Sequence, residues 1–399
     1  MAQPVKKKIQ EIHPDLMTEK PFRTLLIDGT SLLMMCFKDD TRNSDGVHYG
    51  GVYQFLSQLR KQFEKVDPAY CYVFFDDEYS GWKRWELYPL YKANRDKKYD
   101  EYQTSEYMKM MNERLKSMRE YLFSKKKNVK KTYEDPFTKL VNENFTRERA
   151  ILMKYFEELY IRCYMDEICE GDDLISYYCL NKKKNEQIVI VSGDMDLLQL
   201  LSDDICMYEL HKKKYISVKN FKEQFGYHYS NIFVKKVLCG DQSDNIGHIR
   251  GLSETALFEM MPEIEQKPIT VEDVIDRAKQ LIEERKESKK KPLKLHENIV
   301  NAVTTSTYDG DFYEINKKII DLKSPLLTDD AKETMDSMIH APIDPDDRSF
   351  KNLYTYILED KIEKLHSDTV FSEFFSPFKR LEVKEKNRFD LAQKNLKYD

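Results

Sequence analysis

The sequence predicts an α/β protein in which a mostly parallel sheet carries helices on both faces and is followed by a mainly helical lobe. Two observations predict the sheet. Short runs rich in β-branched and aromatic residues alternate with stretches of helical periodicity, and four of these runs lead into carboxylates. A third observation predicts the lobe, because the alternation stops after about Phe221.

The predicted strands are short apolar runs that each lead into acidic residues. The runs and their acids are 22–27 with Asp28, 70–75 with Asp76, 161–165 with Glu170, Asp172 and Asp173, and 188–191 with Asp194 and Asp196. A stripe at helical spacing, which includes Val52, Phe55, Leu59 and Phe63, lies between the first two runs, as a β-α-β connection requires. Ligands of such sheets bind beyond the carboxyl ends of the strands, so we expect these acids to gather there.

An insertion is predicted at about residues 92–146, which are rich in Lys, Tyr, Glu and Met and have no strand pattern. Apolar residues from Tyr107 to Leu122 recur at helical spacing. A basic stretch follows, made of Lys125, Lys126, Lys127, Lys130 and Lys131. We interpret the segment as a helix followed by a basic loop, with a merely solvated loop as the alternative.

Composition excludes several classes of protein. The chain has 399 residues, 41% of them hydrophobic, and no apolar run approaches the roughly 18 to 20 residues of a membrane span. The seven cysteines show no paired or zinc-type spacing, which is typical of reduced thiols and indicates a soluble, cytoplasmic protein. The formal net charge is −5, so a nucleic-acid partner has to be bound by local basic patches.

The acids themselves predict the chemistry. One Asp after a strand is more often a turn residue or helix N-cap than a ligand, so the prediction depends on their number. The set continues with Asp241 and Asp244. Two like charges 4 Å apart cost on the order of 4 kcal/mol at an effective dielectric near 20, so a cluster requires protonation or bound cations. Oxygen ligands favour two Mg²⁺ ions, with Mn²⁺ as a substitute, and two such ions can hydrolyse a phosphodiester.

Five phrases carry a resemblance to a known family: LLIDGTSLL, FDDEYSGWKRWELYPLYKANRDKK, DEICEGDDLISYY, VSGDMDLLQLL and LCGDQSDNIGHIRGL. Their order and spacing resemble the flap endonuclease and 5′→3′ exonuclease superfamily, and SGWKRWELYPLYKANR especially resembles phage-type ribonuclease H. The resemblance covers about residues 23–252. It implies a PIN-like 5′-nuclease core, a helical arch formed by the insertion, and removal of RNA primers and adjacent DNA during replication.

The resemblance also implies roles for individual residues. It makes all nine acids members of a site for two metal ions, with Asp76, Asp172, Asp194 and Asp196 as the first candidates for direct ligands. The residues that it places against nucleic acid are Arg84, Tyr91, Lys92 and Arg95, with Lys92 and Arg95 at the scissile phosphate, Tyr91 stacked on a base and the five arch lysines on a single-stranded 5′ end. A solvated helix face is the alternative for the basic residues, and Trp85 and Tyr88 are expected to be core residues.

The segment 234–257 is similar to the helix-hairpin-helix of this superfamily, but it departs from the family's pattern. It lacks the second glycine and the lysine of that motif, which puts its binding of duplex DNA and of a monovalent cation in doubt. Near the C-terminus, Phe371, Phe374 and Phe375 weakly resemble a sliding-clamp peptide, although core packing is the favoured interpretation.

We therefore predict an α/β nuclease domain at residues 20–220, a helical DNA-binding domain at 221–380, and flexible tails at 1–19 and 381–399. The expected partners are DNA with 5′ flaps or nicks and RNA:DNA hybrids, and the resemblance allows a single-strand-binding protein or sliding clamp; no membrane is expected. Three alternatives stay open: a DNA flap endonuclease with little action on hybrids, a non-catalytic binder of branched DNA, and, less compatible with the length, an RNA-cleaving toxin.

Overall fold

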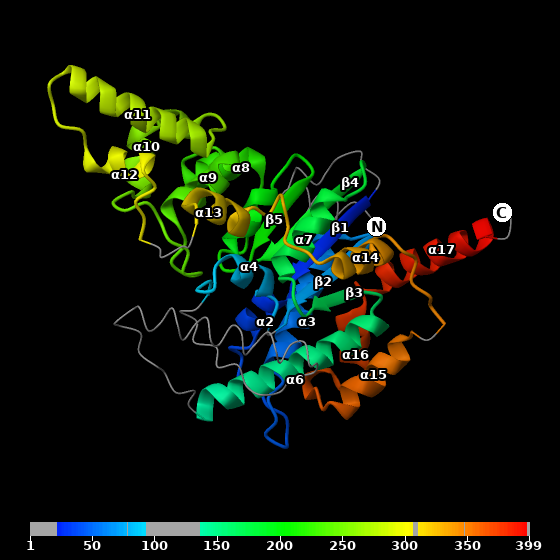
Figure 1. Ribbon diagram of the computed structural model, residues 1–399. Coiled ribbons are helices and arrows are strands. Elements are labelled where there is room, and N and C mark those ends of the chain that lie inside the picture. The colour runs from blue at the N-terminus through cyan, green and yellow to red at the C-terminus, as the bar shows by residue number, and fades with distance from the viewer. Residues whose placement is uncertain (1–21, 78, 93–135, 306–309, 347, 397–399) are drawn as a thin grey trace. The chain divides into compact units, whose positions relative to one another are not determined.

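The computed structural model describes residues 22–77, 79–92, 136–305, 310–346 and 348–396 (Figure 1). These residues form two compact units. Unit 1 takes the described residues of Met1–Ser80, Asp135–Val218 and Leu327–Asp399, and unit 2 takes those of Gly81–Glu134 and Lys219–Leu326. The predicted tail 1–19, the helix expected at 107–122, Arg95 and the five arch lysines lie outside the described residues.

Unit 1 contains a six-stranded sheet in the order β3-β2-β1-β4-β5-β6. Its strands are β1 (Phe22–Asp28), β2 (Tyr70–Asp76), β3 (Arg162–Asp166), β4 (Glu186–Ser192), β5 (Ile205–Glu209) and β6 (Lys214–Ile216). The first five strands are parallel, and β6 runs antiparallel to β5. The predicted α/β class with a mostly parallel sheet is confirmed.

The register of the sheet determines which strand ends lie side by side. Ile27 of β1 pairs with Val73 of β2 and with Val191 of β4, so the carboxyl ends of these three strands meet at one edge. Residues 24–27 are fully buried, as are the first six residues of β2. Strands covered on both faces read as continuous apolar runs, which is why the sequence shows them without alternation.

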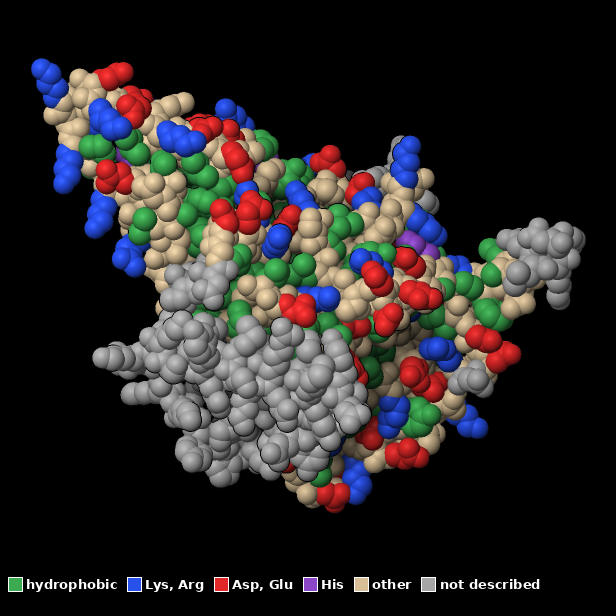
Figure 2. Space-filling model, viewed as in Figure 1, with side chains coloured by type: hydrophobic (Ala, Val, Ile, Leu, Met, Phe, Trp, Pro, Cys, Tyr) green, Lys and Arg blue, Asp and Glu red, His purple; other side chains and the backbone are tan. Residues whose placement is uncertain are grey.

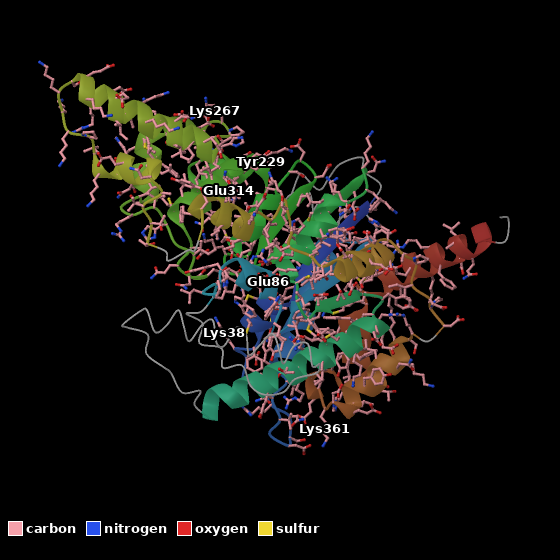
Figure 3. The ribbon with its side chains drawn as sticks, in the orientation of Figure 1. Lys38, Glu86, Tyr229, Lys267, Glu314 and Lys361 are labelled. Carbon is pink, nitrogen blue, oxygen red and sulfur yellow. The ribbon has the colours of Figure 1, made fainter. Side chains whose placement is uncertain are left out.

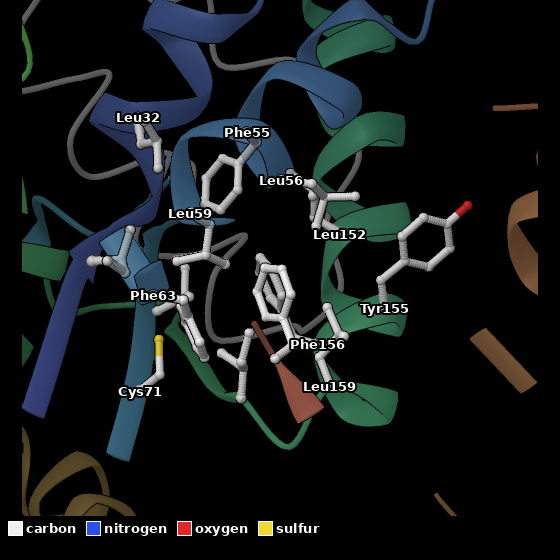
Figure 4. Close-up of a cluster of buried hydrophobic side chains, with 14 of the residues drawn as sticks. Leu32, Phe55, Leu56, Leu59, Phe63, Cys71, Leu152, Tyr155, Phe156 and Leu159 are labelled. Atoms are coloured by element: carbon white, nitrogen blue, oxygen red, sulfur yellow. The ribbon is translucent and has the colours of Figure 1, made fainter. Parts of the chain in front are cut away.

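Helices cover both faces of this sheet. The helices that lie between β1 and β5 in the sequence of unit 1 are α2 (Gly29–Cys36), α3 (Gly50–Val66), α6 (Pro136–Glu158), α7 (Gly171–Leu180) and the 3-10 helix η3 (Met195–Leu200). The core between the sheet, α3 and α6 is apolar, with Phe55, Leu59 and Phe63 facing Leu152 and Phe156 (Figure 4). Each of these side chains is at most 1% exposed, and burying one stabilises the fold by about 1.5 to 3 kcal/mol.

The last helices of the chain belong to unit 1, contrary to the predicted single helical domain at 221–380. They are α14 (Asp329–Met338), α15 (Phe350–Glu359), the 3-10 helix η6 (Glu363–Leu365), α16 (Asp368–Phe375) and α17 (Lys379–Leu396). Phe374 and Phe375 of α16 lie in the unit 1 core, as favoured over a clamp-binding peptide.

Helix α17 also replaces most of the flexible tail expected at 381–399. Glu385 is fully buried and accepts from Arg162 Nη1 at the start of β3 over 2.6 Å. Lys384 Nζ donates to the carboxylate and carbonyl of Asp67 at 3.0 and 3.1 Å. These contacts attach α17 to the amino-terminal ends of the strands, and local periodicity could not reveal them.

Unit 2 is helical, as predicted for the residues after the alternation stops. Its elements are α4 (Trp82–Leu87), α8 (Val218–Phe225), which starts at the unit boundary, η4 (Tyr229–Asn231), α9 (Ile232–Cys239), α10 (Glu254–Met260), η5 (Pro262–Glu265), α11 (Val271–Glu287), α12 (Lys294–Val300) and α13 (Phe312–Ile320). Among the described residues, none of the helices is long and apolar enough to cross a membrane.

The predicted helix-hairpin-helix is formed by α9, a loop and α10. Asp241 and Ile246 exchange two backbone hydrogen bonds across the loop, at 3.1 and 2.8 Å. Gly240 ends α9 with φ 68°, and a Cβ there would lie 2.6 Å from the carbonyl oxygen of Ile246. Only glycine fits this turn without strain.

Candidate active site

The centre of the acidic edge is Asp28, the last residue of β1 and the N-cap of α2. Its Oδ1 accepts from the backbone N–H of Ser31 at 2.9 Å, and its Oδ2 accepts from Ser192 Oγ at 2.5 Å. Gly29 allows α2 to begin against β2, because a Cβ there would lie 2.7 Å from the Phe75 ring. The turn from strand to helix thus positions Asp28 at the edge with both oxygens bound.

Asp76 ends the neighbouring strand β2. Its Oδ1 accepts from the N–H of Gly171 at the start of α7 over 2.7 Å, and its own N–H donates to Thr30 Oγ1 at 2.8 Å. Arg149 of α6 donates to the Asp76 carbonyl at 2.7 Å. Asp76 is therefore connected to α2, α6 and α7, which fix its position relative to Asp28.

Two further segments bring acids to this edge. Helix α7 begins with Glu170 at its N-cap and Asp172 in its first turn. The segment after β4 places Asp194 at the N-cap of η3, where its N–H donates to Ser192 Oγ at 2.8 Å and its Oδ1 accepts from the N–H of Asp196 at 2.8 Å. Four chain segments therefore contribute carboxylates to one edge, as predicted.

The electrostatics show that these carboxylates interact. Burial and the neighbouring carboxylates of Asp76 and Asp194 raise the pKa of Asp28 from 3.8 to about 7. Burial, followed by the carboxylates of Asp194, Asp28, Asp76 and Glu170, holds the pKa of Asp172 well above its usual value. Like charges disfavour the ionised form of one another, so this edge favours either a proton or a bound cation.

The donor set fits a hard divalent cation in its chemistry, since it consists of carboxylate oxygens from several segments. Within the described residues, however, no three His, Cys, Asp or Glu side chains converge as ligands around a single point. Both observations hold, because charges influence one another over about 4 to 6 Å, which is longer than a metal–ligand bond. Oxygens of Asp28, Asp76 and Asp194 accept from backbone or hydroxyl donors instead.

The other predicted acids of unit 1 lie close by in the sequence but differ in setting. Asp173 is 1% exposed in α7, and Asp196 is half-buried in η3. Neither is among the carboxylates that act most strongly on Asp28 and Asp172. Their inclusion in the metal site stays a prediction.

Asp241 and Asp244 lie in unit 2, in the loop between α9 and α10. Burial alone would raise the pKa of Asp241, but Lys236 Nζ at 2.6 Å and two donors of Ser243 outweigh it and lower the pKa to about 2. Asp244 is buried and accepts from the Tyr91 hydroxyl at 3.2 Å. The structure thus joins Asp241 to a lysine, and the role of both acids in metal binding stays a prediction.

Two residues predicted to contact nucleic acid are instead interior residues of unit 2. Arg84 is 4% exposed, and its Nε donates to the carbonyl of Ile319 in α13 at 2.9 Å. Tyr91 is 3% exposed, with its hydroxyl on Asp244, so its ring is not available to stack on a base in this conformation. Both side chains complete the packing of unit 2 as they lie here, and their contact with nucleic acid stays a prediction.

Lys92 keeps its candidacy. It is half-buried, has a left-handed backbone with φ 52°, and donates its N–H to the carbonyl of Asp244 at 2.9 Å. Its Nζ lies 4.9 Å from the centroid of the Tyr91 ring. Trp85 and Tyr88 are each 3% exposed, which confirms the core packing expected for them.

The sequence reasoning missed the residues that position the acids. They are Thr30, which binds Asp76, Ser31 and Ser192, which bind Asp28, and Arg149. Ser192 Oγ also accepts from the N–H of Asp194, and Ser31 Oγ accepts from the N–H of Gly193 at 3.0 Å. The only sign of the hydroxyl residues in the sequence is that they stand next to the acids, in Asp-Gly-Thr-Ser and in Ser-Gly-Asp. Such neighbours are too common to identify a functional residue.

Comparison with known proteins supports the same fold. The family model of the 5′-3′ exonuclease N-terminal, resolvase-like domain matches residues 23–226. The chain is similar to DNA polymerase I of Caldicellulosiruptor bescii, with 25% identity over 278 residues, which cover 67% of this chain and 27% of the polymerase. It is also similar to a 5′-3′ exonuclease of Mycoplasmopsis pulmonis, with 26% identity over 242 residues, which cover 59% of this chain and 64% of that protein. The matched region thus spans less than two thirds of either relative.

Solved structures share the fold at low identity. The bacteriophage T5 flap endonuclease in complex with DNA and metal ions matches with a TM-score of 0.51 and 15% identity, covering 91% of this chain and 99% of that one. The T5 5′-exonuclease with bound zinc ions matches with a TM-score of 0.51 and 16% identity over the same shares. Because the family model covers more than half of the sequence and the sheet follows the predicted arrangement, the chain belongs to the family of the 5′-3′ exonuclease N-terminal, resolvase-like domain.

Proposed function

We propose that this protein is a divalent-metal-dependent 5′-nuclease that hydrolyses phosphodiester bonds near the 5′ ends of nucleic-acid strands during DNA replication. The observation that carries the proposal is the mutual effect of the carboxylates of Asp28, Asp76, Asp172 and Asp194 at the carboxyl edge of the sheet. Membership of the 5′-3′ exonuclease family supports it, since all four residues lie within the matched residues 23–226.

The acidic edge would hold the ions through Asp28, Asp76, Glu170, Asp172 and Asp194, with Asp173 and Asp196 as further candidates in unit 1. For Asp241 and Asp244 of unit 2, a role as metal ligands is proposed from the family resemblance alone. Two divalent ions, Mg²⁺ or Mn²⁺, would supply there the chemistry of an activated water and of charge stabilisation at the leaving oxygen. The carboxylates supply the negative charge that retains the cations. Ser31, Ser192 and the N–H of Gly171 position Asp28 and Asp76 at this edge, and the oxygens that bind an ion would exchange these donors for it.

Cationic side chains complete the proposal. Lys92 and Arg95 neutralise charge on the scissile phosphate, and the arch lysines 125–127, 130 and 131 guide a single-stranded 5′ end by salt-dependent attraction. The roles of Lys92 and Arg95 come from the family resemblance, and that of the arch lysines comes from the helical pattern at 107–122 and the basic stretch after it. Arg95 and the arch lysines lie outside the described residues.

The proposed substrates are DNA with 5′ flaps or nicks and the RNA of RNA:DNA hybrids. The T5 flap endonuclease was solved with DNA and metal ions, and the T5 exonuclease with zinc, which supports the same class of substrate and cofactor here. A cytoplasmic site of action agrees with seven cysteines that form no disulfide. Contacts with a single-strand-binding protein or sliding clamp belong to the same proposal.

One assay tests the proposal. Purified protein with Mg²⁺ is incubated with 5′-labelled flap, nicked-duplex and RNA:DNA hybrid substrates, and the products are sized. Short 5′-phosphorylated products from all three support the primer-removing nuclease, whereas cleavage of the flap alone supports a DNA flap endonuclease. Tight binding with no cleavage in Mg²⁺ or Mn²⁺ would indicate a non-catalytic binder and overturn the proposal.

A further inference from the structure

Helix α11 is the longest described helix of unit 2, and the basic residues along it differ in their ion pairs from those that follow it. Along the body of the helix, basic residues are paired with acids: Lys279 with Asp276 at 2.8 Å, and Lys286 with Glu283 at 2.7 Å. Arg277 likewise lies 3.0 Å from Glu284. Such pairs are typical of a solvated helix surface and need no partner to explain them.

The turn that follows α11 differs. Between Arg285 and Lys294 the chain has six basic residues and one acidic residue. Lys289, Lys290, Lys291 and Lys294 are all exposed, and within the described part of the chain none of them forms an ion pair with a carboxylate. We call these four residues the lysine tip.

The lysine tip is an ordered turn. The N–H of Lys290 donates to the carbonyl of Arg285 at 2.8 Å, and that of Lys289 donates to the carbonyl of Lys286 at 2.9 Å. Arg285 Nε then closes the turn on the carbonyl of Lys291 at 2.9 Å. The guanidinium thus binds the backbone of the turn, and the lysine ammonium groups point outward from a defined loop.

The tip also lies away from the packed part of unit 2. The buried residues of α11 are Val271, Val274 and Ala278, all in its first half, and its second half has no buried residue. Figure 1 shows α11 running out from the other helices of unit 2, with α12 beside it, and in Figure 3 Lys267 marks the start of the helix. Figure 2 shows basic side chains gathered around this outer end. A 17-residue helix is roughly 25 Å long, so the tip reaches well beyond α9 and α10.

A third observation concerns the charge of this region. Burial, together with Arg285 and Arg277, lowers the pKa of His296 in α12. The positive charges of Arg285 and Arg277 therefore act between α11 and α12, and the exposed lysine tip adds further positive charge at the same end of the pair. This arrangement suits an extended polyanion better than a compact acidic group, since the charges are spread along one end of a long element.

We propose that the lysine tip binds the phosphate backbone of the duplex arm of the substrate, at a site separate from the hairpin between α9 and α10. This deepens the proposed function, on which it rests. Lysine binds phosphate as a flexible point charge without reading sequence, and duplex DNA presents phosphates at high density. An acidic protein is the alternative occupant, but the tip offers only one exposed large apolar side chain, Leu293, as an anchor for a protein interface.

The test compares two triple variants with the same charge change. The tip variant carries Lys289→Gln, Lys290→Gln and Lys291→Gln. The control carries Lys279→Gln, Lys286→Gln and Lys332→Gln, each of which removes a lysine paired with an acid three residues earlier. Binding is measured without divalent ions, so that the result does not depend on cleavage, on a 5′-flap substrate with a long duplex arm and on a single strand of equal length, between 50 and 200 mM salt.

The tip variant should bind the duplex substrate roughly tenfold more weakly at 100 mM salt, and its slope of log affinity against log salt should become shallower by about 0.9 for each phosphate that the variant no longer binds. The control should resemble the wild type, as should the tip variant on the single strand. An unchanged slope, or an equal loss on the single strand, would overturn the assignment to duplex DNA. Failure of the proposed nuclease function would show instead as absent cleavage by the wild type, with duplex binding still sensitive to the tip.

Discussion

The two edges of the central sheet each contain a buried carboxylate, and the pKa values of these two carboxylates are shifted in opposite directions. Strands β1 and β4 are paired side by side, and a buried carboxylate lies at each end of this pair, Glu186 at one and Asp28 at the other. At their amino-terminal edge, Glu186 accepts from Thr24 Oγ1, from the Tyr178 hydroxyl at 2.8 Å and from the N–H of Lys183 at 2.9 Å, and it lies 2.9 Å from His340 Nε2. At the other edge, Asp28 lies among carboxylates.

The difference appears in the pKa values. Burial alone would raise the pKa of Glu186, but the bonds from His340 and Thr24 outweigh it and lower the pKa below its usual value. Burial and carboxylate neighbours raise that of Asp28 to about 7. Depth of burial is similar, at 0% and 7% exposure, so the neighbours decide the sign. A carboxylate with enough hydrogen-bond donors, such as Glu186, stabilises the fold in its ionised form. A carboxylate among other carboxylates, such as Asp28, favours binding of a proton or a cation.

The largest expected effect follows from removing a charge at the crowded edge. Asp194→Asn keeps the shape of the side chain and should lower the rate of cleavage on the order of a thousandfold or more, because it removes a candidate metal ligand. DNA binding should stay equal or become tighter, since repulsion of phosphate falls. Single-turnover cleavage and equilibrium binding of a 5′-flap substrate measure the two effects. Wild-type turnover in this variant would remove Asp194 from the site.

The next prediction concerns stability and pH. Because the pKa of Asp28 is raised in the folded state, its contribution to stability is fully present below about pH 4 and is lost as the pH rises through about 7. Asp28→Asn should therefore stabilise the metal-free protein at pH 8, by at most about 4 kcal/mol, and have little effect at pH 4. Urea unfolding in a chelator at both pH values checks this. An equal gain at both would show that packing, and not charge, is responsible.

Lys92→Ala tests the role proposed for Lys92 at the scissile phosphate. The rate of cleavage should fall about a hundredfold without loss of Mn²⁺ binding, since Lys92 acts on phosphate charge. Lys83→Ala, which removes a lysine from the nearby helix α4, is the control and should cleave normally. Titration with Mn²⁺ and single-turnover assays separate the two roles, and weakened Mn²⁺ binding in Lys92→Ala would contradict the proposal.

The smallest effect is expected at the satisfied edge. Glu186→Gln should destabilise the fold by about 2 kcal/mol, because it leaves donors that no longer face a charged acceptor. Its own pKa is lowered, so the loss should be visible at neutral pH and should shrink as the pH falls below about 4.5. Cleavage per folded molecule should not change. If cleavage fell as far as in Asp194→Asn, the two edges would not be separate in function.

The sequence was sufficient for the sheet and for the acidic edge. Strands buried on both faces leave continuous apolar runs, and a carboxylate at the end of such a run has few other places to lie. The sequence did not show side-chain direction or distant packing. Matching motifs placed Arg84 against nucleic acid and Tyr91 on a base, but Arg84 binds the carbonyl of Ile319, 235 residues away, and no local pattern reports that contact.

The C-terminal helices illustrate the same limit. The periodicity of α16 and α17 predicted amphipathic helices or a tail, but it could not tell which surface their apolar stripes cover. The ring of Phe378, between the two helices, lies 4.5 Å from that of Phe63 in α3, and Glu385 binds Arg162. Both contacts join segments more than 200 residues apart, and such pairs leave no trace in a single sequence.

The return of α14 to α17 to the sheet has a consequence for synthesis on the ribosome. Unit 1 includes Leu327–Asp399, so the residues of unit 2 emerge from the exit tunnel while the sheet still lacks part of its cover. Glu385 is synthesised 223 residues after its partner Arg162, and contacts of such sequence separation form late because loop closure costs entropy. In a nascent chain, the strands of the sheet are therefore made before residues 219–326, but the helices that complete its cover are made after them.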